Sequence, residues 1–122
     1  MQIAAEKYDR GRFRVLAVSG EVDVYSAPSL KGLLVDVIDS TSASRGQDGS
    51  ETPTNGVVLD LSGVPFMDSA GLGVLVGAQR RAHGAGLALR LAGGSAQLHR
   101  LLAMTGLVKV LPPFADVAAA TA

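Results

Sequence analysis

The residues best suited to chemistry are the adjacent carboxylate and hydroxyl of Asp68 and Ser69. They stand between a short apolar run at 57–61 and a longer run with helical periodicity that follows them. A serine at this point suits two roles: its oxygen can cap the helix, or it can accept a phosphoryl group. Capping is the more common role of such a serine. The two roles are compatible, because the N–H groups and the dipole of a helix N-terminus also stabilise a phosphate.

The rest of the sequence lacks the residues for other common chemistries. The segment 67–71, MDSAG, differs from the G-x-S-x-G turn of serine hydrolases, and no general base accompanies Ser69. His83 and His99 have no carboxylate or nucleophile motif beside them, and the chain has no cysteine. We therefore expect no catalytic residue, no metal site and no cofactor, and we interpret the chain as something other than an enzyme.

Two glycines, Gly71 and Gly73, follow the serine inside the predicted helix. Each costs up to about 1 kcal/mol relative to alanine in a helix interior, so the pair calls for a physical reason. Two interpretations stay open: close packing against the sheet, or a smooth surface that lets a partner reach Ser69. The glycines do not begin a dinucleotide-binding fingerprint, because Val76 occupies the position of its third glycine.

Composition bounds the function further. The 122 residues suit a single domain, 1–122, and eleven basic and eleven acidic side chains give a formal net charge of zero. That balance argues against non-specific nucleic-acid binding, which needs a basic face, and two tyrosines and three phenylalanines without tryptophan offer little for stacking on bases. No apolar run approaches the length of a membrane span and no signal segment opens the chain, so we expect a cytoplasmic protein.

The elements that must position Ser69 are a strand before it and a helix after it. The apolar run at 57–61 is typical of a strand that is buried on both faces. Ser69 is the predicted N-cap of a helix that continues to His83, and Gly84 is the predicted left-handed residue at its end. The sequence thus places the hydroxyl at the end of a buried strand and at the positive end of a helix dipole.

An earlier helix follows from apolar residues at positions 30, 33, 34, 37 and 38. We expect it to begin after an N-cap at Ser26 and to end near Asp39. The next segment, 40–55, contains no apolar residue larger than alanine. Such a composition predicts a disordered insertion, with a loop that contacts a partner as the alternative.

The remaining patterns predict short strands and helices on both sides of this centre. Strands joined through helices should run parallel, and an initial hairpin adds an antiparallel edge. The expected fold class is α/β, with a small mixed sheet of about four to five strands packed with about four α-helices. The further predicted strands are 2–8, 12–19, 87–91 and 107–111, and the further helices are 96–103, which is capped by Gly106, and 114–120.

Three stretches resemble the STAS-domain anti-sigma factor antagonists of bacteria: FMDSAGLGVL at 66–75, GEVD at 20–23 and LLAMTGL at 101–107. The resemblance covers nearly the whole chain, departs from the family mainly in the longer segment 40–55, and implies the STAS fold. It implies that Ser69 is the phosphorylated residue. The partner-binding face that it implies consists of Asp23, Asp68, Ser69, Ala70, Gly71, Leu72 and Gly73.

For both aspartates a structural role remains open. Asp23 and Asp68 can each serve as a turn or capping acid, since aspartate favours both positions. The alternative for Asp23 is a place on the partner surface. The alternative for Asp68, beside Ser69, is to orient the serine for a kinase or to disfavour a fixed phosphate by repulsion.

The function that the resemblance implies is a phosphorylation switch in transcription regulation, in the setting of stress response or sporulation. The unphosphorylated protein binds an anti-sigma factor that is also a serine kinase, and this binding releases a sigma factor. Phosphorylation of Ser69 ends the complex, and a PP2C-type phosphatase restores it. No direct contact with nucleic acid or membrane is expected. The alternative is a STAS module that senses a nucleotide or another small molecule, although the sequence offers no phosphate-binding loop.

Overall fold

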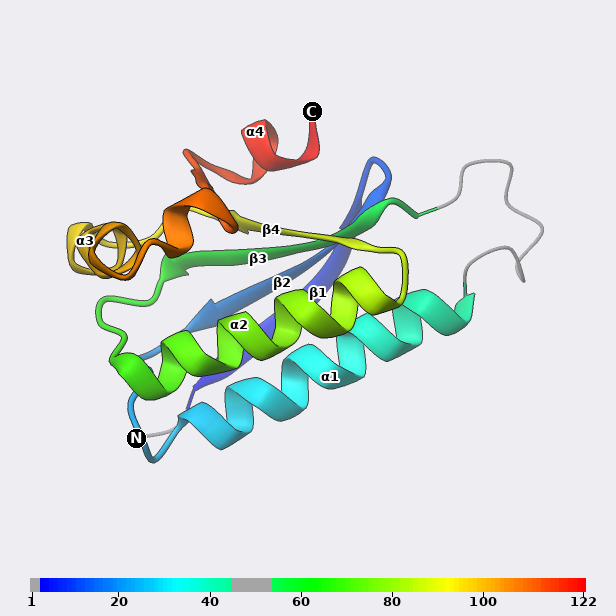
Figure 1. Cartoon of the computed structure of the whole chain (residues 1–122). Coiled ribbons are helices and arrows are strands. Elements are labelled where there is room, and N and C mark those ends of the chain that lie inside the picture. The colour runs from blue at the N-terminus through cyan, green and yellow to red at the C-terminus, as the bar shows by residue number, and fades with distance from the viewer. Residues whose placement is uncertain (1–2, 45–53) are drawn as a thin grey trace.

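The computed structural model describes residues 3–44 and 54–122, and within them it has a five-stranded sheet with strand order β1-β2-β3-β4-β5 (Figure 1). β1 and β2 form an antiparallel hairpin, and the other neighbouring strands pair in parallel. The strands are β1 (Ala4–Arg10), β2 (Phe13–Ser19), β3 (Gly56–Gly63), β4 (Ala88–Ala92) and β5 (Pro113–Phe114). The helices are α1 (Ala27–Ser44), α2 (Ser69–Gly84), α3 (Ala96–Thr105), the 3-10 helix η1 (Leu107–Lys109) and α4 (Val117–Thr121).

The helices cover the two faces of the sheet unequally. α1 and α2 lie side by side against one face, α4 lies over the other, and α3 lies where β3 and β4 end (Figure 1). The larger hydrophobic core is on the α1 and α2 side and the smaller one is beneath α4. Alternate residues of β3 enter different cores, because Val57 and Leu59 belong to the larger and Val58 to the smaller. The predicted burial of this strand on both faces is therefore confirmed, as is the mixed sheet with four α-helices.

The first helix has the predicted buried stripe but a later end. Leu30, Leu34, Val37 and Ile38 are buried, as the periodicity predicts. The helix does not end near Asp39 but continues to Ser44, so the predicted loop boundary is wrong by five residues. Thr41 explains the extension: it is buried three residues after Ile38 and continues the same face. Residues 45–53 of the predicted insertion lie outside the described residues.

The C-terminal part departs most from the prediction. The predicted strand 107–111 is wrong: Leu107, Val108 and Lys109 form η1, and the amides of Lys109 and Val110 bond within this turn. Those amides are therefore not available to a strand ladder. Gly106 has a φ of 77° and ends α3 as predicted. The fifth strand and α4 come later, and Asp116 caps α4.

The end of α2 also differs from the prediction in its cap. Gly84 is the last helical residue and does not have a positive φ. Gly86, two residues later, has a φ of 73° and makes the left-handed turn into β4. Across the described residues, no helix is both long and apolar enough to span a membrane.

Candidate functional site

The site lies where β2 and β3, neighbouring parallel strands, end at the same edge of the sheet. The chain after β2 and the chain after β3 form an isolated parallel bridge between Val22 and Met67. The Val22 N–H donates to Phe66 O at 2.9 Å, and the Asp68 N–H donates to Val22 O at 3.0 Å. Asp23 and Asp68, forty-five positions apart in the sequence, thus follow two directly paired residues. The structure therefore brings the two acidic residues to one end of the fold.

Asp68, not Ser69, is the N-cap of α2. Its backbone is extended, with φ −99° and ψ −173°, and its Oδ1 accepts hydrogen bonds from Ala70 N at 2.9 Å and Gly71 N at 3.2 Å. The predicted N-cap at Ser69 is therefore wrong by one residue. Both residue types are good caps, so the sequence alone does not separate them. The structural role left open for Asp68 is confirmed.

The Ser69 side chain is left free by this arrangement. Ser69 is the first residue of α2 and is exposed. Among the residues that the structure describes, none forms a hydrogen bond with its hydroxyl group. An exposed hydroxyl without a partner at the start of a helix is accessible to an enzyme that transfers a phosphoryl group.

Asp23 builds the turn that leads into α1. Its Oδ1 accepts from Tyr25 N at 2.9 Å and from Ser26 N at 3.0 Å. The hydrogen bond from the Ser26 backbone is the main cause that lowers the pKa of Asp23, and the one from Tyr25 adds to it. Asp23 therefore has the structural role of a turn acid, which was one of its two alternatives.

Ser26 precedes the first residue of α1 but does not cap it in the predicted way. Its carbonyl accepts from Ser29 N and Leu30 N, so it occupies the position of an N-cap. Its hydroxyl instead accepts from Asp23 N at 3.0 Å and lies 2.9 Å from Glu21 O, to which it donates. The hydroxyl therefore fastens the turn rather than the helix.

Gln97 holds the loop between β3 and α2 in place, and sequence reasoning missed it. Its Nε2 donates to Met67 O at 2.7 Å and its Oε1 accepts from Met67 N at 3.0 Å. The amide side chain thus satisfies both backbone groups of one residue, as a neighbouring strand would. No motif marks Gln97, because its role depends on α3 lying beside a loop thirty residues earlier.

The two glycines of α2 have different reasons to be glycine. A Cβ at Gly71 would lie 2.6 Å from Met67 Cγ and 2.7 Å from Val22 Cγ1, so this glycine allows the helix to pack on the paired loops. A Cβ at Gly73 would have no neighbouring atom within 4 Å. Close packing therefore explains Gly71, and an open surface explains Gly73.

The predicted partner-binding residues do not all reach the surface. Leu72 has 6% of its surface exposed and belongs to the larger core, so its side chain cannot provide the predicted contact. Three apolar side chains that were not predicted are exposed in the same two loops. Val24 is 60% exposed, Tyr25 is 84% exposed and Phe66 is 40% exposed. Large apolar residues within turns are the sequence signal that could have identified them.

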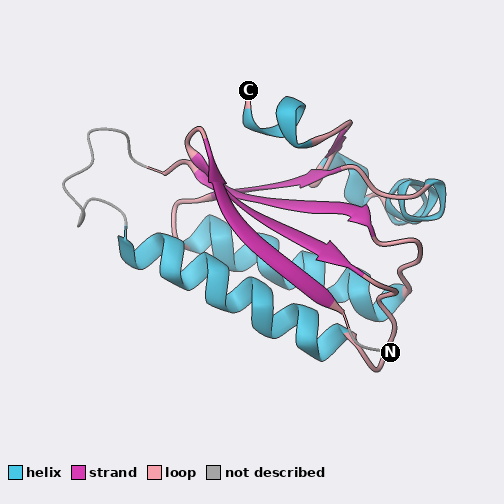
Figure 2. Ribbon diagram, turned by 180° about the vertical axis from the view of Figure 1, so that it is seen from behind, coloured by secondary structure: helices cyan, strands magenta, loops and turns pink. Residues whose placement is uncertain are grey.

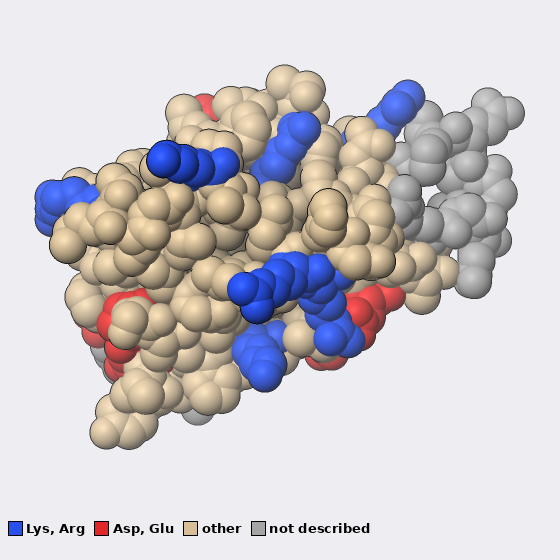
Figure 3. All heavy atoms as spheres, in the orientation of Figure 1, with Lys and Arg blue, Asp and Glu red and all other residues tan. Residues whose placement is uncertain are grey.

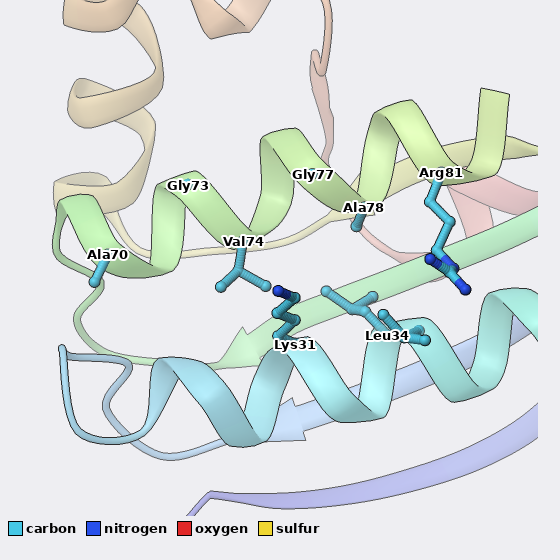
Figure 4. A pocket seen from close by; sticks show the side chains of 9 residues that line it. Lys31, Leu34, Ala70, Gly73, Val74, Gly77, Ala78 and Arg81 are labelled. Atoms are coloured by element: carbon cyan, nitrogen blue, oxygen red, sulfur yellow. The ribbon is translucent and has the colours of Figure 1, made fainter. Parts of the chain in front are cut away.

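A groove between α1 and α2 runs along the surface from Ala70. It has a volume of about 350 Å³, and Gly73 and Gly77 leave it open on the α2 side (Figure 4). Lys31 reaches into it from α1, while Arg81 at its far end donates to both carboxylate oxygens of Asp39, at 2.8 and 2.7 Å. This ion pair lowers the pKa of Asp39, chiefly through the hydrogen bond from Arg81.

Charge is distributed unevenly along this face. Lysine and arginine side chains gather over the middle of α1 and α2, and acidic side chains lie both directly beside them and at the end where α2 begins (Figure 3). Within the described part of the chain there is no cluster of three or more histidine, aspartate or glutamate side chains that could hold a metal ion. The site is thus an exposed hydroxyl with acidic and apolar neighbours.

The chain is similar to known proteins over most of its length. The STAS domain family model matches residues 3–120. The anti-sigma-B factor antagonist of Bacillus subtilis is 37% identical over 94 residues, which cover 77% of this chain and 74% of that protein. The anti-sigma-B factor antagonist of Staphylococcus aureus (strain NCTC 8325 / PS 47) is 32% identical over 107 residues, 88% of each chain.

A solved structure is similar over the same range. The crystal structure of an anti-sigma factor antagonist from Mycobacterium paratuberculosis superposes with a TM-score of 0.77 at 26% identity, covering 95% of this chain and 88% of that one. The family model spans both loops of the site and the helix that carries Ser69. The chain belongs to the STAS-domain family of anti-sigma factor antagonists.

Proposed function

We propose that this protein is an anti-sigma factor antagonist whose binding is switched off by phosphorylation of Ser69. The observation that carries the proposal is the exposed Ser69 hydroxyl, free of hydrogen-bond partners among the described residues, at the first position of α2. Val24, Tyr25 and Phe66 expose apolar surface in the adjoining loops, as a protein interface requires. The names of the two sequence relatives support an anti-sigma factor as the partner.

In this proposal the protein is a ligand and a substrate, not an enzyme. The unphosphorylated form binds a cytoplasmic anti-sigma factor that has serine kinase activity, and a sigma factor is released. The kinase then transfers the γ-phosphoryl group of ATP to Ser69: the Oγ–P bond forms, the bond to ADP breaks, and the hydroxyl proton passes to a base of the kinase. A PP2C-type phosphatase hydrolyses the phosphoester and restores the binding form.

The electrostatics at the start of α2 explain why a phosphate would end the complex. A phosphoserine carries a charge of roughly −1.5 to −2. Asp68 already occupies the N–H groups of Ala70 and Gly71, so these two donors are not free to neutralise a phosphate on Ser69. The added charge therefore stands beside a fixed carboxylate on the exposed face. Like charge at an interface costs several kcal/mol, on the order of 3, which corresponds to a roughly hundredfold loss of affinity.

The test combines mass spectrometry with calorimetry. The protein is incubated with a candidate anti-sigma kinase and ATP, and the phosphopeptide is located. We expect one phosphate, on Ser69, and none in the Ser69→Ala variant. Ser62→Ala is the matched control, since Ser62 is also exposed, near the end of β3, but bonds to Asp60. Phosphate on Ser62 or Thr105 in the wild type contradicts the assignment.

Binding of the same anti-sigma factor tests the switch itself. Ser69→Ala should bind like the wild type and resist inactivation by the kinase, and Ser69→Glu should bind about a hundredfold more weakly while remaining folded. Equal affinity of folded Ser69→Glu and wild type excludes an electrostatic switch at this position.

The groove between α1 and α2 supports a second candidate function, the sensing of a nucleotide or small molecule. Its volume of about 350 Å³ is within the range of ligand pockets, and Lys31 supplies a cation for an anionic group. Calorimetric titration with ATP and GTP, with Lys31→Ala as the control, measures this binding. Absence of heat with either nucleotide removes them as ligands.

A further inference from the structure

The strand β1 has a free edge. It is one of the two edge strands of the described sheet, and its only neighbour among the described strands is β2. All seven of its residues, Ala4–Arg10, are exposed. Figure 2 shows the molecule from this side, and neither α1 nor α2 passes in front of the strand. An edge strand of this length offers a row of backbone donors and acceptors to another strand.

The charges on β1 have opposite signs on the two sides of Tyr8. Glu6 and Lys7 precede it, and Asp9 and Arg10 follow it. The two charges nearest to Tyr8 are therefore Lys7 and Asp9, and the two outer ones are Glu6 and Arg10. Alternate residues of a strand point to opposite faces, so Glu6, Tyr8 and Arg10 share one face and Lys7 and Asp9 share the other.

This pattern is complementary to itself in one antiparallel register. If two copies of β1 pair with Tyr8 opposite Tyr8, then Glu6 of one copy lies opposite Arg10 of the other, and Lys7 lies opposite Asp9. Two-fold symmetry repeats each contact, so every charge from Glu6 to Arg10 has an opposite charge across the strands. Directly opposite residues of an antiparallel pair are on the same face, and opposite charges there stabilise the pairing.

The neighbouring registers lack this complementarity. Pairing centred on Lys7 places lysine opposite lysine, and pairing centred on Asp9 places aspartate opposite aspartate. Pairing centred between residues is excluded, because it would oppose side chains that point to different faces. The register centred on Tyr8 is thus selected by charge as well as by geometry.

We propose that two copies of this chain form a dimer by antiparallel pairing of their β1 strands, centred on Tyr8. The two five-stranded sheets then become one continuous sheet. Tyr8 is 42% exposed and pairs with Val15 of β2 within its own chain, so the two tyrosines form a contact that continues an existing row of apolar side chains. On the other face Asp9 is bonded to Arg14 at 3.0 Å and gains Lys7 of the second copy on its free side.

The dimer leaves the Ser69 sites accessible. A two-fold axis perpendicular to the sheet reverses the direction of β2 and β3 in the second copy. Because Ser69 follows the end of β3, the two serines lie at opposite ends of the continuous sheet. Dimerisation and binding at Ser69 are therefore independent, and each can be tested without the other.

Charge reversal at the outer pair provides the test. Sedimentation equilibrium of the wild-type chain over a wide concentration range should show a monomer–dimer equilibrium. Glu6→Arg brings two arginines together at each contact, and Arg10→Glu brings two glutamates together. Each variant alone should raise the dimer dissociation constant at least about tenfold, because two attractive pairs become repulsive. Arg100→Glu, which changes the charge of an exposed residue on α3, is the control and should dimerise like the wild type.

Mixing the two weakened variants gives the decisive result. In a heterodimer of Glu6→Arg with Arg10→Glu, arginine again faces glutamate at both contacts, so the equimolar mixture should recover wild-type affinity. Wild-type protein that stays monomeric at every concentration overturns the proposal, and its edge charges then serve only to prevent association. A mixture that recovers no affinity overturns it as well.

Cysteine crosslinking tests the register. The chain has no cysteine, so one introduced thiol has no competitor. Under mild oxidation Tyr8→Cys should form a disulfide-linked dimer rapidly, because the two Cα atoms of opposite residues lie within the range for a disulfide. Lys7→Cys should link slowly alone and rapidly when mixed with Asp9→Cys. Faster self-linking of Lys7→Cys than of Tyr8→Cys excludes the proposed register.

Discussion

Alanine substitutions at the two glycines of α2 should change stability in opposite directions. In Gly71→Ala the new methyl group would lie 2.6 Å from Met67 Cγ and 2.7 Å from Val22 Cγ1. Both of these side chains are fully buried, with 0% of their surface exposed, so they cannot turn away into solvent. Overpacking of this kind costs about 1–3 kcal/mol. In Gly73→Ala the methyl group meets no neighbour within 4 Å.

The pair of variants isolates the packing term. Alanine is favoured over glycine in a helix interior by up to about 1 kcal/mol, and this gain applies to both positions because they lie in the same helix. Gly73→Ala should therefore stabilise the protein by up to about 1 kcal/mol. Gly71→Ala should be about 2 kcal/mol less stable than Gly73→Ala, since the helix preference cancels in the difference and the packing cost remains.

Urea unfolding measures both free energies, and thermal unfolding gives an independent value. A difference of about 2 kcal/mol corresponds to roughly 8 °C in Tm for a domain of this size. Equal stabilisation by Gly71→Ala and Gly73→Ala would refute the reasoning, because it would mean that α2 does not pack closely on Val22 and Met67.

Three other changes test the support of the site. Asp68→Ala should cost about 1 kcal/mol of unfolding free energy through the lost cap, while Asp68→Asn, which keeps an acceptor oxygen, should retain most of it; equal losses in urea unfolding would contradict the capping role. Gln97→Ala should leave both backbone groups of Met67 without a partner and lower the unfolding free energy by about 1 kcal/mol. Hydrogen exchange of the Met67 amide should become several-fold faster. Unchanged exchange would show that other contacts hold the loop. The lowered pKa of Asp23 means that its ionised form stabilises the fold at pH values above its unfolded pKa, and that this stabilisation is lost as pH falls through the folded pKa. Asp23→Asn should therefore make the unfolding free energy less dependent on pH below about 4. An unaltered acid-unfolding curve would argue against this linkage.

Much of the fold could be predicted because its main elements carry local signals. The stripe of α1 repeats with helical spacing, and the run at 57–61 is apolar on both faces of its strand. The segment 107–111 carries an equally apolar signal but is not a strand. Leu111 is buried although it follows the 3-10 helix η1 and is not in a strand, and its amide donates to Leu107 O at 2.7 Å. A short apolar run satisfies burial in either conformation, so tertiary context decides between them.

The position of the candidate site in the fold could be predicted from the sequence, but its hydrogen bonds could not. The approach of Asp23 and Asp68 follows from a general property of parallel strands, whose carboxyl ends meet at one edge of the sheet. The contribution of Gln97 depends on how α3 lies against the loop, which no local pattern encodes. The exposure of Tyr25 likewise depends on the turn that Asp23 forms, since the Tyr25 amide donates to Asp23 Oδ1.

The exchange of roles between Asp68 and Ser69 has a consequence for how a switch can work here. If the serine hydroxyl capped α2, its modification would remove a cap and weaken the helix. Because Asp68 provides the cap, the hydroxyl of Ser69 contributes no hydrogen bond to the described fold. Under the proposed function a phosphate on Ser69 would therefore change the charge of the surface while the helix start keeps its bonds. Stability and switching then depend on adjacent but different side chains, so Asp68→Ala should lower the unfolding free energy and Ser69→Ala should leave it unchanged.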